Sequence, residues 1–237
     1  LGQVEARQVL SAYGVRMPAE ELSNSVEQAC QAAGRMGWPV VLKIVSPDIP
    51  HKTEAGGVEL HLGSAAAVEA AYGRILANAK RHVPDARIEG IQVQKMQPPG
   101  REMVVGIVND PDFGPLVMLG FGGIYVEVLR DVVFALAPLD LNDAHDMIQR
   151  LKGKALLEGV RGEAASDVAA LAQLLVGVSN LVASNPGRIS EIDLNPVMLY
   201  PVGQGAIAVD ALVLIEAEKN PALGVSPETK ILQNRRN

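Results

Sequence analysis

The sequence contains one cysteine, Cys30, and few aromatic residues. A single thiol cannot form an internal disulfide, and cysteine this scarce favours a reducing compartment. Cys30 lies in an Ala-rich helical pattern, which predicts a buried side chain without a catalytic role. Aromatic residues make up 3% of the chain and the formal net charge is −6. We therefore expect neither the stacking side chains nor the basic surface of a nucleic-acid-binding protein.

Long apolar runs are absent as well. No stretch approaches the roughly 18 apolar residues of a membrane-spanning helix, and no signal peptide is visible at the start. We therefore expect no membrane partner and a cytoplasmic location. The chain begins at Leu1, which predicts a processed or excised piece. Its 237 residues, 48% of them hydrophobic, suit one large domain or two lobes with a sizeable core.

Helical and strand patterns alternate irregularly along the chain. Because strict βαβ alternation is missing, the expected fold class is α+β, in two lobes that meet at the turn 98–100. Helices are expected over 3–13, 25–36, 64–79, 141–151 and from a cap at Ser166 onward. Strands are expected over 40–46, 58–62, 88–96, 101–108, 115–119, 132–136, 189–199 and 206–209.

A lysine, Lys43, stands inside an apolar strand, where a cation is costly unless an anion meets it. The loop that follows contains His51, Lys52, Thr53 and a Gly-Gly pair at 56–57 whose backbone amides could approach a ligand. This combination indicates a polyphosphate site beside a histidine that could accept a phosphoryl group. A snorkelling lysine followed by an ordinary turn explains the same residues equally well.

Oxygen-bearing side chains gather near the C-terminal end of the sequence. Period-two alternation places Glu191, Asp193 and Asn195 on one face of a strand, and Asp210 ends a strand that could pair with it. Such oxygen ligands suit Mg²⁺, which keeps waters and phosphate oxygens among its ligands. A solvated strand face is the better explanation of these residues alone. The polyphosphate site reverses that preference, because nucleotide phosphates usually arrive with Mg²⁺.

A third cluster is Gln94-Lys95-Met96 with Glu102 beyond the turn. A strand edge before a turn exposes backbone groups that can pair with a flat base, and a carboxylate can accept ribose hydroxyls. Taken alone, Glu102 is more simply a solvated residue. The loop 120–123 contains three glycines, with Glu127 near it, but lacks the spacing of a Walker or Rossmann loop.

Together these residues resemble the ATP-grasp fold, and specifically the nucleotide-binding part of NDP-forming acyl-CoA synthetases. That group includes ADP-forming acetyl-CoA synthetase and is related to the succinyl-CoA synthetase β subunit. The resemblance covers about residues 3–217 and rests on short motifs that follow one another in one order. These are Glu5-Ala6 through Tyr13-Gly14 with Pro18, Val41-Leu42-Lys43, Ser46-Pro47-Asp48, His51-Lys52-Thr53, Gly56-Gly57-Val58, Gln94-Lys95-Met96, Gly100-Arg101-Glu102, Asp110-Pro111, Phe113-Gly114-Pro115, Gly120-Phe121-Gly122-Gly123, Glu191-Ile192-Asp193-Leu194-Asn195-Pro196 and Asp210.

The resemblance implies a two-lobed ATP-grasp fold with the nucleotide cleft between the lobes. Residues 16–96 would form the small lobe, residues 1–15 and 97–217 the large lobe, and residues 218–237 a C-terminal tail. ATP or ADP would bind together with Mg²⁺.

The resemblance also implies a role for each cluster. Lys43 would hold phosphates, the loop 51–53 would cover them, and the segment 94–96 would meet adenine. Glu102 would lie at the nucleotide, while Asn195 and Asp210 would hold Mg²⁺. The succinyl-CoA branch has Gly-Arg-Gly in the loop where this chain has His51-Lys52-Thr53. In the ADP-forming acetyl-CoA branch a histidine in this loop relays the phosphoryl group, which points to His51 as the catalytic residue.

The implied activity is that of an acid–thiol ligase, an ADP-forming acyl-CoA synthetase. The reaction converts acyl-CoA, ADP and phosphate to or from carboxylate, CoA and ATP. The CoA-binding, succinyl-CoA ligase-like domains would lie elsewhere in the same chain or in a partner chain, so this chain should not complete the reaction alone. Two alternatives stay open: an ATP-sensing regulatory ATP-grasp domain and an ATP-grasp carboxylate–amine ligase. Neither the acid nor the choice between ATP and GTP can be read from the residues.

Overall fold

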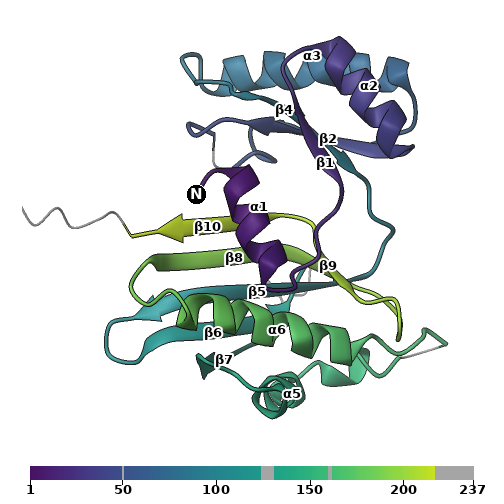
Figure 1. The fold of residues 1–237 in the computed structure, drawn as a ribbon. Helices are drawn as coiled ribbons and strands as arrows, with labels where there is room; N and C mark the ends of the chain where they lie inside the picture. Colours follow the sequence, from purple (N-terminus) through teal and green to yellow (C-terminus); the bar gives the residue numbers. More distant parts are fainter. Residues whose placement is uncertain (50, 124–130, 160–161, 217–237) are drawn as a thin grey trace, which may run out of the picture.

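The chain folds around two antiparallel sheets, which lie one above the other in Figure 1. The computed structural model describes residues 1–49, 51–123, 131–159 and 162–216. The four-stranded sheet has the order β1-β4-β2-β3 and contains β1 (Glu20–Ser23), β2 (Val40–Val45), β3 (Val58–Leu62) and β4 (Gly90–Lys95). The larger sheet has the order β10-β8-β5-β6-β7, with β9 paired to β8. Its strands are β5 (Arg101–Asp110), β6 (Gly114–Phe121), β7 (Val132–Leu136), β8 (Ile189–Leu199), β9 (Ala206–Ala208) and β10 (Ala211–Ile215).

Each sheet has its own hydrophobic core and its own helices. Helices α2 (Val26–Met36) and α3 (Ala65–His82) pack on the four-stranded sheet. Helices α1 (Gln3–Ala12), α5 (Leu141–Arg150) and α6 (Val168–Ala183) pack on the larger sheet, and a short 3-10 helix, η1 (Lys154–Leu156), follows α5. Figure 1 shows the chain crossing between the two layers after α1 and again after β4. The α+β prediction is therefore confirmed.

Helix α1 is the first element of the sequence, yet it belongs to the core of the larger sheet. Its residues Ala6 and Leu10 are buried there, together with Val15 just beyond the helix. The amino group of Leu1 donates a hydrogen bond to the carbonyl of Val213 in β10 at 3.0 Å. Apolar burial and this contact fix the start of the chain beside the edge strand β10.

Several local predictions need correction. Asp167, not Ser166, caps α6, because its carboxylate accepts from the backbone N–H of Ala170. Ser166 instead forms an isolated bridge with Pro201. Cys30 is only partly buried, and the polar strand β1 and the apolar strand β10 were not expected.

Some expectations fall outside what the structure describes or tests. The tail 218–237 and Glu127 lie outside the described residues. The division into lobes at residues 15/16 and 96/97 stays a prediction. None of the helices within the described ranges combines the length and the apolar character that crossing a membrane requires.

Candidate functional site

Lys43 lies at the junction of the two sheets. Its neighbours in β2, Leu42 and Ile44, point into the small core, so the alternation of the strand turns Lys43 toward the larger sheet. The side chain is 8% exposed, and its Nζ lies 3.2 Å from the carbonyl oxygen of Val209 and 3.5 Å from Oδ2 of Asp210. Burial lowers the pKa of Lys43, while the Asp210 carboxylate opposes that shift. The anion that a buried lysine requires is thus supplied by the other sheet.

Gln94 makes a second connection at the same place. Its Nε2 donates to the Val209 carbonyl and to Oε2 of Glu20, both at 3.0 Å. Arg7 of α1 forms an ion pair with the same Glu20 oxygen at 3.0 Å. Two side chains of the four-stranded sheet therefore hold one carbonyl of the larger sheet. Arg7, Glu20 and Val209 carry no motif. Helix α1, strand β1 and the turn between β9 and β10 bring them together only in the folded chain.

A cleft of about 580 Å³ lies beside this network. The loop after β2 contributes His51 and Lys52, strand β8 contributes Asp193 and Asn195, and the turn between β9 and β10 contributes Asp210. Burial raises the pKa of Asp193, and the carboxylates of Glu191 and Asp210 raise it further. The cleft therefore places basic side chains opposite a concentration of negative charge.

The donor set of this cleft fits a magnesium ion that is shared with phosphates. Asn195 and Asp210 offer an amide oxygen and a carboxylate, the ligand types that Mg²⁺ prefers. Within the described ranges, no group of three or more His, Cys, Asp or Glu residues could hold a metal by itself. A site with two protein ligands suits Mg²⁺ only when waters and phosphate oxygens complete its shell.

The loop after β2 forms a compact turn. The backbone N–H groups of Gly56 and Gly57 donate to the carbonyls of Thr53 and Lys52, at 3.0 and 2.7 Å. A Cβ at Gly57 would lie 2.4 Å from a side-chain carbon of Ile44, so only glycine fits there. The glycine pair thus closes the turn, and the expectation that its amides approach a ligand is wrong. The turn directs His51 and Lys52 to the cleft, whereas Thr53 is exposed and lies outside its lining.

Glu102 lines a separate cavity of about 640 Å³, together with Gly122, Gly123 and Tyr200. The N–H of Gly122 donates to the Glu102 carbonyl at 2.7 Å. Gly123 has φ +61°, and a Cβ on it would lie 2.7 Å from Oε2 of Glu102. The glycine loop after β6 therefore closes around this carboxylate. The structure brings His51, Lys52, Asn195 and Asp210 into one cleft but leaves Glu102 in another.

Substitution of Gly123 by alanine should disturb Glu102 specifically. The added Cβ costs about 1–2 kcal/mol in a left-handed conformation and displaces the carboxylate. Gly203→Ala is the matched control, because Gly203 has φ +82° and open space around it. We expect both variants to lose similar stability in thermal melts. Calorimetry should find ADP affinity reduced about fivefold or more in Gly123→Ala alone, and equal affinities would contradict a nucleotide role for Glu102.

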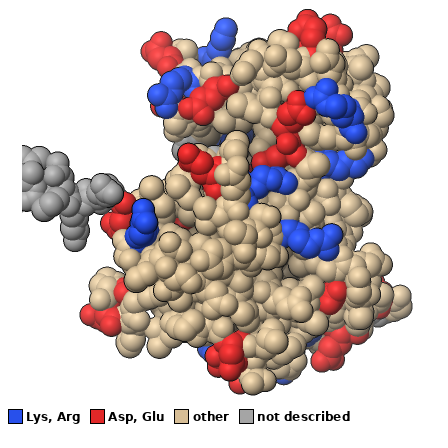
Figure 2. Space-filling view, in the orientation of Figure 1, with Lys and Arg blue, Asp and Glu red and all other residues tan. Residues whose placement is uncertain are grey.

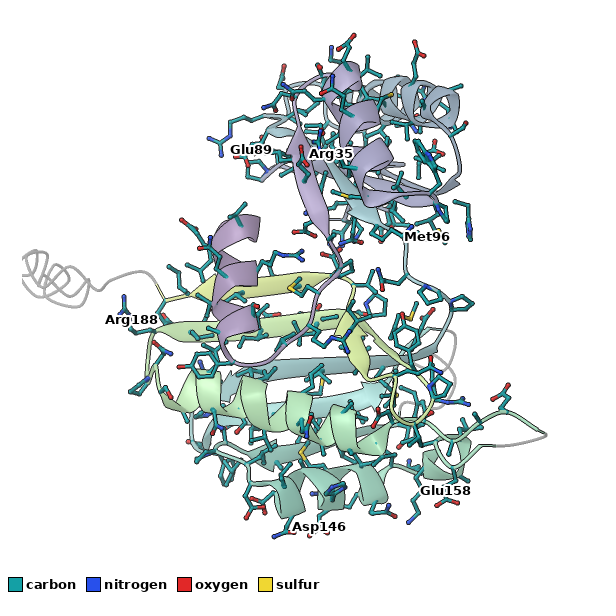
Figure 3. All side chains as sticks on the ribbon, turned by 45° about the vertical axis from the view of Figure 1, so that its right-hand side comes forward. Arg35, Glu89, Met96, Asp146, Glu158 and Arg188 are labelled. Atoms are coloured by element: carbon teal, nitrogen blue, oxygen red, sulfur yellow. The ribbon has the colours of Figure 1, made fainter. Side chains whose placement is uncertain are left out.

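The segment 94–96 offers backbone rather than side chains. Nζ of Lys95 donates to the carbonyls of Gly37 and Trp38, at 3.1 and 2.9 Å, so this side chain turns away from the junction. The N–H of Met96 donates to the Pro39 carbonyl at 3.2 Å. Figure 3 shows Met96 on the segment that leads from β4 to β5, between the two sheets. Contact of this segment with adenine stays a prediction.

Charged residues of both signs mingle on the face that Figure 2 shows. Acidic and basic side chains alternate over the four-stranded sheet and the junction below it. Two of the surface pairs around the four-stranded sheet are Arg35–Glu21 and Arg74–Glu59. Such surface pairs contribute little stability, so the junction network differs from them by its burial.

Comparison with known proteins identifies the class of this fold. Residues 1–215 match the ATP-grasp domain family, and the chain belongs to that family. It is 41% identical to the β subunit of ADP-forming acetate–CoA ligase II of Pyrococcus furiosus, over 90% of this chain and 91% of that subunit. It is 44% identical to ADP-forming acetate–CoA ligase I of Archaeoglobus fulgidus, but covers 29% of that longer protein.

A solved structure gives the same result. The dinucleotide-forming acetyl-coenzyme A synthetase 1 of Ca. Korarchaeum cryptofilum, in complex with coenzyme A and Ca-AMPCP, superposes with a TM-score of 0.86 at 43% identity. The match covers 91% of this chain and 93% of that chain. The predicted resemblance to ADP-forming acyl-CoA synthetases is thus confirmed.

Proposed function

We propose that this chain is the nucleotide-binding and phosphoryl-relay module of an ADP-forming acyl-CoA synthetase. The observation that carries the proposal is the junction itself, where buried Lys43 meets Asp210 beside a cleft that His51, Lys52 and Asn195 line. A cation for phosphates, ligands for a divalent metal and an accessible histidine lie together there. ATP or ADP and Mg²⁺ are the ligands that this chemistry suits.

His51 is the proposed acceptor of the phosphoryl group. In this step the bond between the γ-phosphorus and its bridging oxygen breaks, ADP leaves, and a phosphorus–nitrogen bond forms to the neutral imidazole. Lys43 and Lys52 would neutralise charge on the moving group, which phosphoryl transfer requires more than acid–base work. Mg²⁺, held by Asn195 and Asp210, would supply further neutralisation when bound. His51 is exposed at the cleft, so its side chain can reach a group delivered from outside.

The remaining nucleotide contacts are proposed for the segment 94–96 and for Glu102. Gln94 and Lys95 would contribute backbone groups, since their side chains already have partners. Glu102 would accept ribose hydroxyls from its own cavity. We propose accordingly that residues 16–96 act as the small lobe over a larger lobe formed by 1–15 and 97–217.

Thioester formation requires a second component. The chain covers 91% of a β subunit that it resembles but only 29% of a fused synthetase. We propose that the CoA-binding, succinyl-CoA ligase-like domains are supplied by a partner subunit or by another part of the same polypeptide, in the cytoplasm. A regulatory ATP-sensing domain would bind nucleotide without phosphorylation, and a carboxylate–amine ligase would not need His51.

The metal ligands can be tested by the dependence of ADP affinity on Mg²⁺. In Asn195→Ala and Asp210→Asn the gain in affinity on adding Mg²⁺ should shrink about tenfold or more. Each variant loses one oxygen contact to the doubly charged metal ion, the amide of Asn195 or the carboxylate of Asp210. Asp112→Asn, an exposed change in the turn between β5 and β6, is the control. Titration calorimetry with and without Mg²⁺ separates this effect from the loss of the Lys43 ion pair. A gain equal to that of the unaltered chain would count against the metal site.

A further inference from the structure

The larger sheet has one covered face and one open face. Its register aligns rows of residues across the strands, and rows alternate between the two faces. One buried row contains Val213, Ile192, Ile107 and Val117, which belong to the core beneath α5 and α6. The neighbouring rows point the opposite way, and Figure 1 shows α1, α5 and α6 together on the near side of the sheet.

The open face is apolar over β5, β6 and β7. We call the following six residues the open-face patch: Val108, Leu116, Met118, Val132, Phe134 and Leu136. Four of them are large hydrophobic side chains that are 40–52% exposed. A solvated face of an antiparallel sheet normally alternates to polar residues, so a contiguous apolar surface indicates an interaction site.

Strand β8, which pairs with β5, gives this face a negative charge. Glu191 pairs with Val108 and Asp193 with Gly106, so both carboxylates lie in the same rows as the patch. These rows contain no lysine or arginine at any of their positions in β5, β6, β7, β8 or β10. The complementary surface is therefore apolar and bordered by basic side chains. A second copy of this chain would bring no such cation in these rows, which argues against self-association through this face.

The patch also lies within reach of the phosphoryl site. Phe134 and Asp193 share one row, three strand spacings apart, which is roughly 14 Å. Asp193 in turn lines the cleft with His51 and Asn195. A protein seated on the patch would stand beside the cleft without filling it.

We propose that the open-face patch docks the CoA-binding half of the enzyme. The inference rests on the proposed function, because a relay needs a second component next to His51. Relatives in which this chain covers 29% of the length carry that much larger remainder in the same polypeptide. Phe134, the aromatic residue of the patch, is the expected anchor.

Photo-crosslinking in the assembled enzyme tests the docking. With Phe134 replaced by benzoyl-phenylalanine, crosslinks should map to the CoA-binding half in at least fivefold excess over the same probe at Val202. Val202 lies away from the patch and is the more accessible of the two in the isolated chain, 71% exposed against 45% for Phe134. Crosslinks to a second copy of this chain, or none above the Val202 control, would overturn the proposal.

A pair of charge variants separates docking from the relay. Phe134→Glu and Leu136→Glu should weaken association with the CoA-binding half at least tenfold, whereas Val202→Glu should not. ADP binding and phosphorylation of the isolated chain should stay within twofold in all three. If the isolated chain accepts no phosphoryl group at all, the proposed relay through His51 is contradicted. The crosslinks from Phe134 still test the docking surface independently. Unchanged association in both patch variants would refute the surface.

Discussion

Replacing His51 by asparagine should reduce phosphoryl transfer from ATP to the protein on the order of 1000-fold or more. The reason is chemical, because an amide cannot form the phosphorus–nitrogen bond that the relay requires. His51 is exposed at the rim of the cleft, so the substitution should change the free energy of unfolding by about 0.5 kcal/mol at most. ADP affinity should therefore change about twofold or less.

Phosphoryl transfer to the His51 variant is measured by incubation with γ-labelled ATP and Mg²⁺, followed by a test for acid-labile, base-stable protein phosphate. His145→Asn is the matched control, since His145 is an exposed histidine on α5 far from the cleft lining. It should label like the unaltered protein. Undiminished labelling of the His51 variant would exclude His51 as the acceptor.

Replacing Lys43 by methionine should weaken ADP binding about 10- to 100-fold without lowering the thermal midpoint. Hydrogen bonds from a cation to phosphate contribute about 1.5–3 kcal/mol each, and burial keeps Lys43 free of competing water. Loss of the lysine should not destabilise the fold. Because burial lowers its pKa, the charged form of Lys43 costs folding free energy at every pH below that pKa.

The effect of the Lys43 substitution on stability depends on Asp210, the carboxylate that loses its ion-pair partner. A fully buried carboxylate left alone would cost several kcal/mol, but the Asp210 side chain is 37% exposed and stays hydrated. Lys80→Met, at an exposed position in the last turn of α3, controls for the loss of a positive charge. Calorimetry and thermal melts of both variants check the prediction. A Lys43 variant that melts well below the control while keeping its affinity would make Lys43 a structural residue.

Much of the fold follows from local pattern. The strand of Lys43 and the helices capped by Ser25 and Ser64 have strong periodicity, and the structure places them within a few residues of expectation. Strand β1 is not predicted because its sequence, Glu-Glu-Leu-Ser, has no apolar alternation. It forms the edge of the sheet and pairs with β4 alone. The cap of α6 is one residue later than expected because Ser166 and Asp167 are both good capping residues.

The site is only partly readable from the sequence. Lys43 and the oxygen-bearing cluster each stand out, because a cation in a strand and carboxylates on one face are unusual. The sequence does not predict that Lys43 and this cluster lie together in space, because 166 residues separate Lys43 from the carbonyl that it contacts. Glu20 illustrates the same limit: its carboxylate joins Arg7 to Gln94 only after β1 and β4 pair. The role of Gly57 depends on Ile44, a contact that composition cannot predict.

We expect this chain alone to accept a phosphoryl group from ATP and to return it to ADP. The most direct measurement is a two-step label transfer with the isolated chain, in the absence of CoA, phosphate and any carboxylic acid. γ-Labelled ATP and Mg²⁺ should place label on a peptide that contains His51, and subsequent ADP should recover that label as ATP. Tight ATP binding without any labelled peptide, or label on a residue other than His51, would contradict the account.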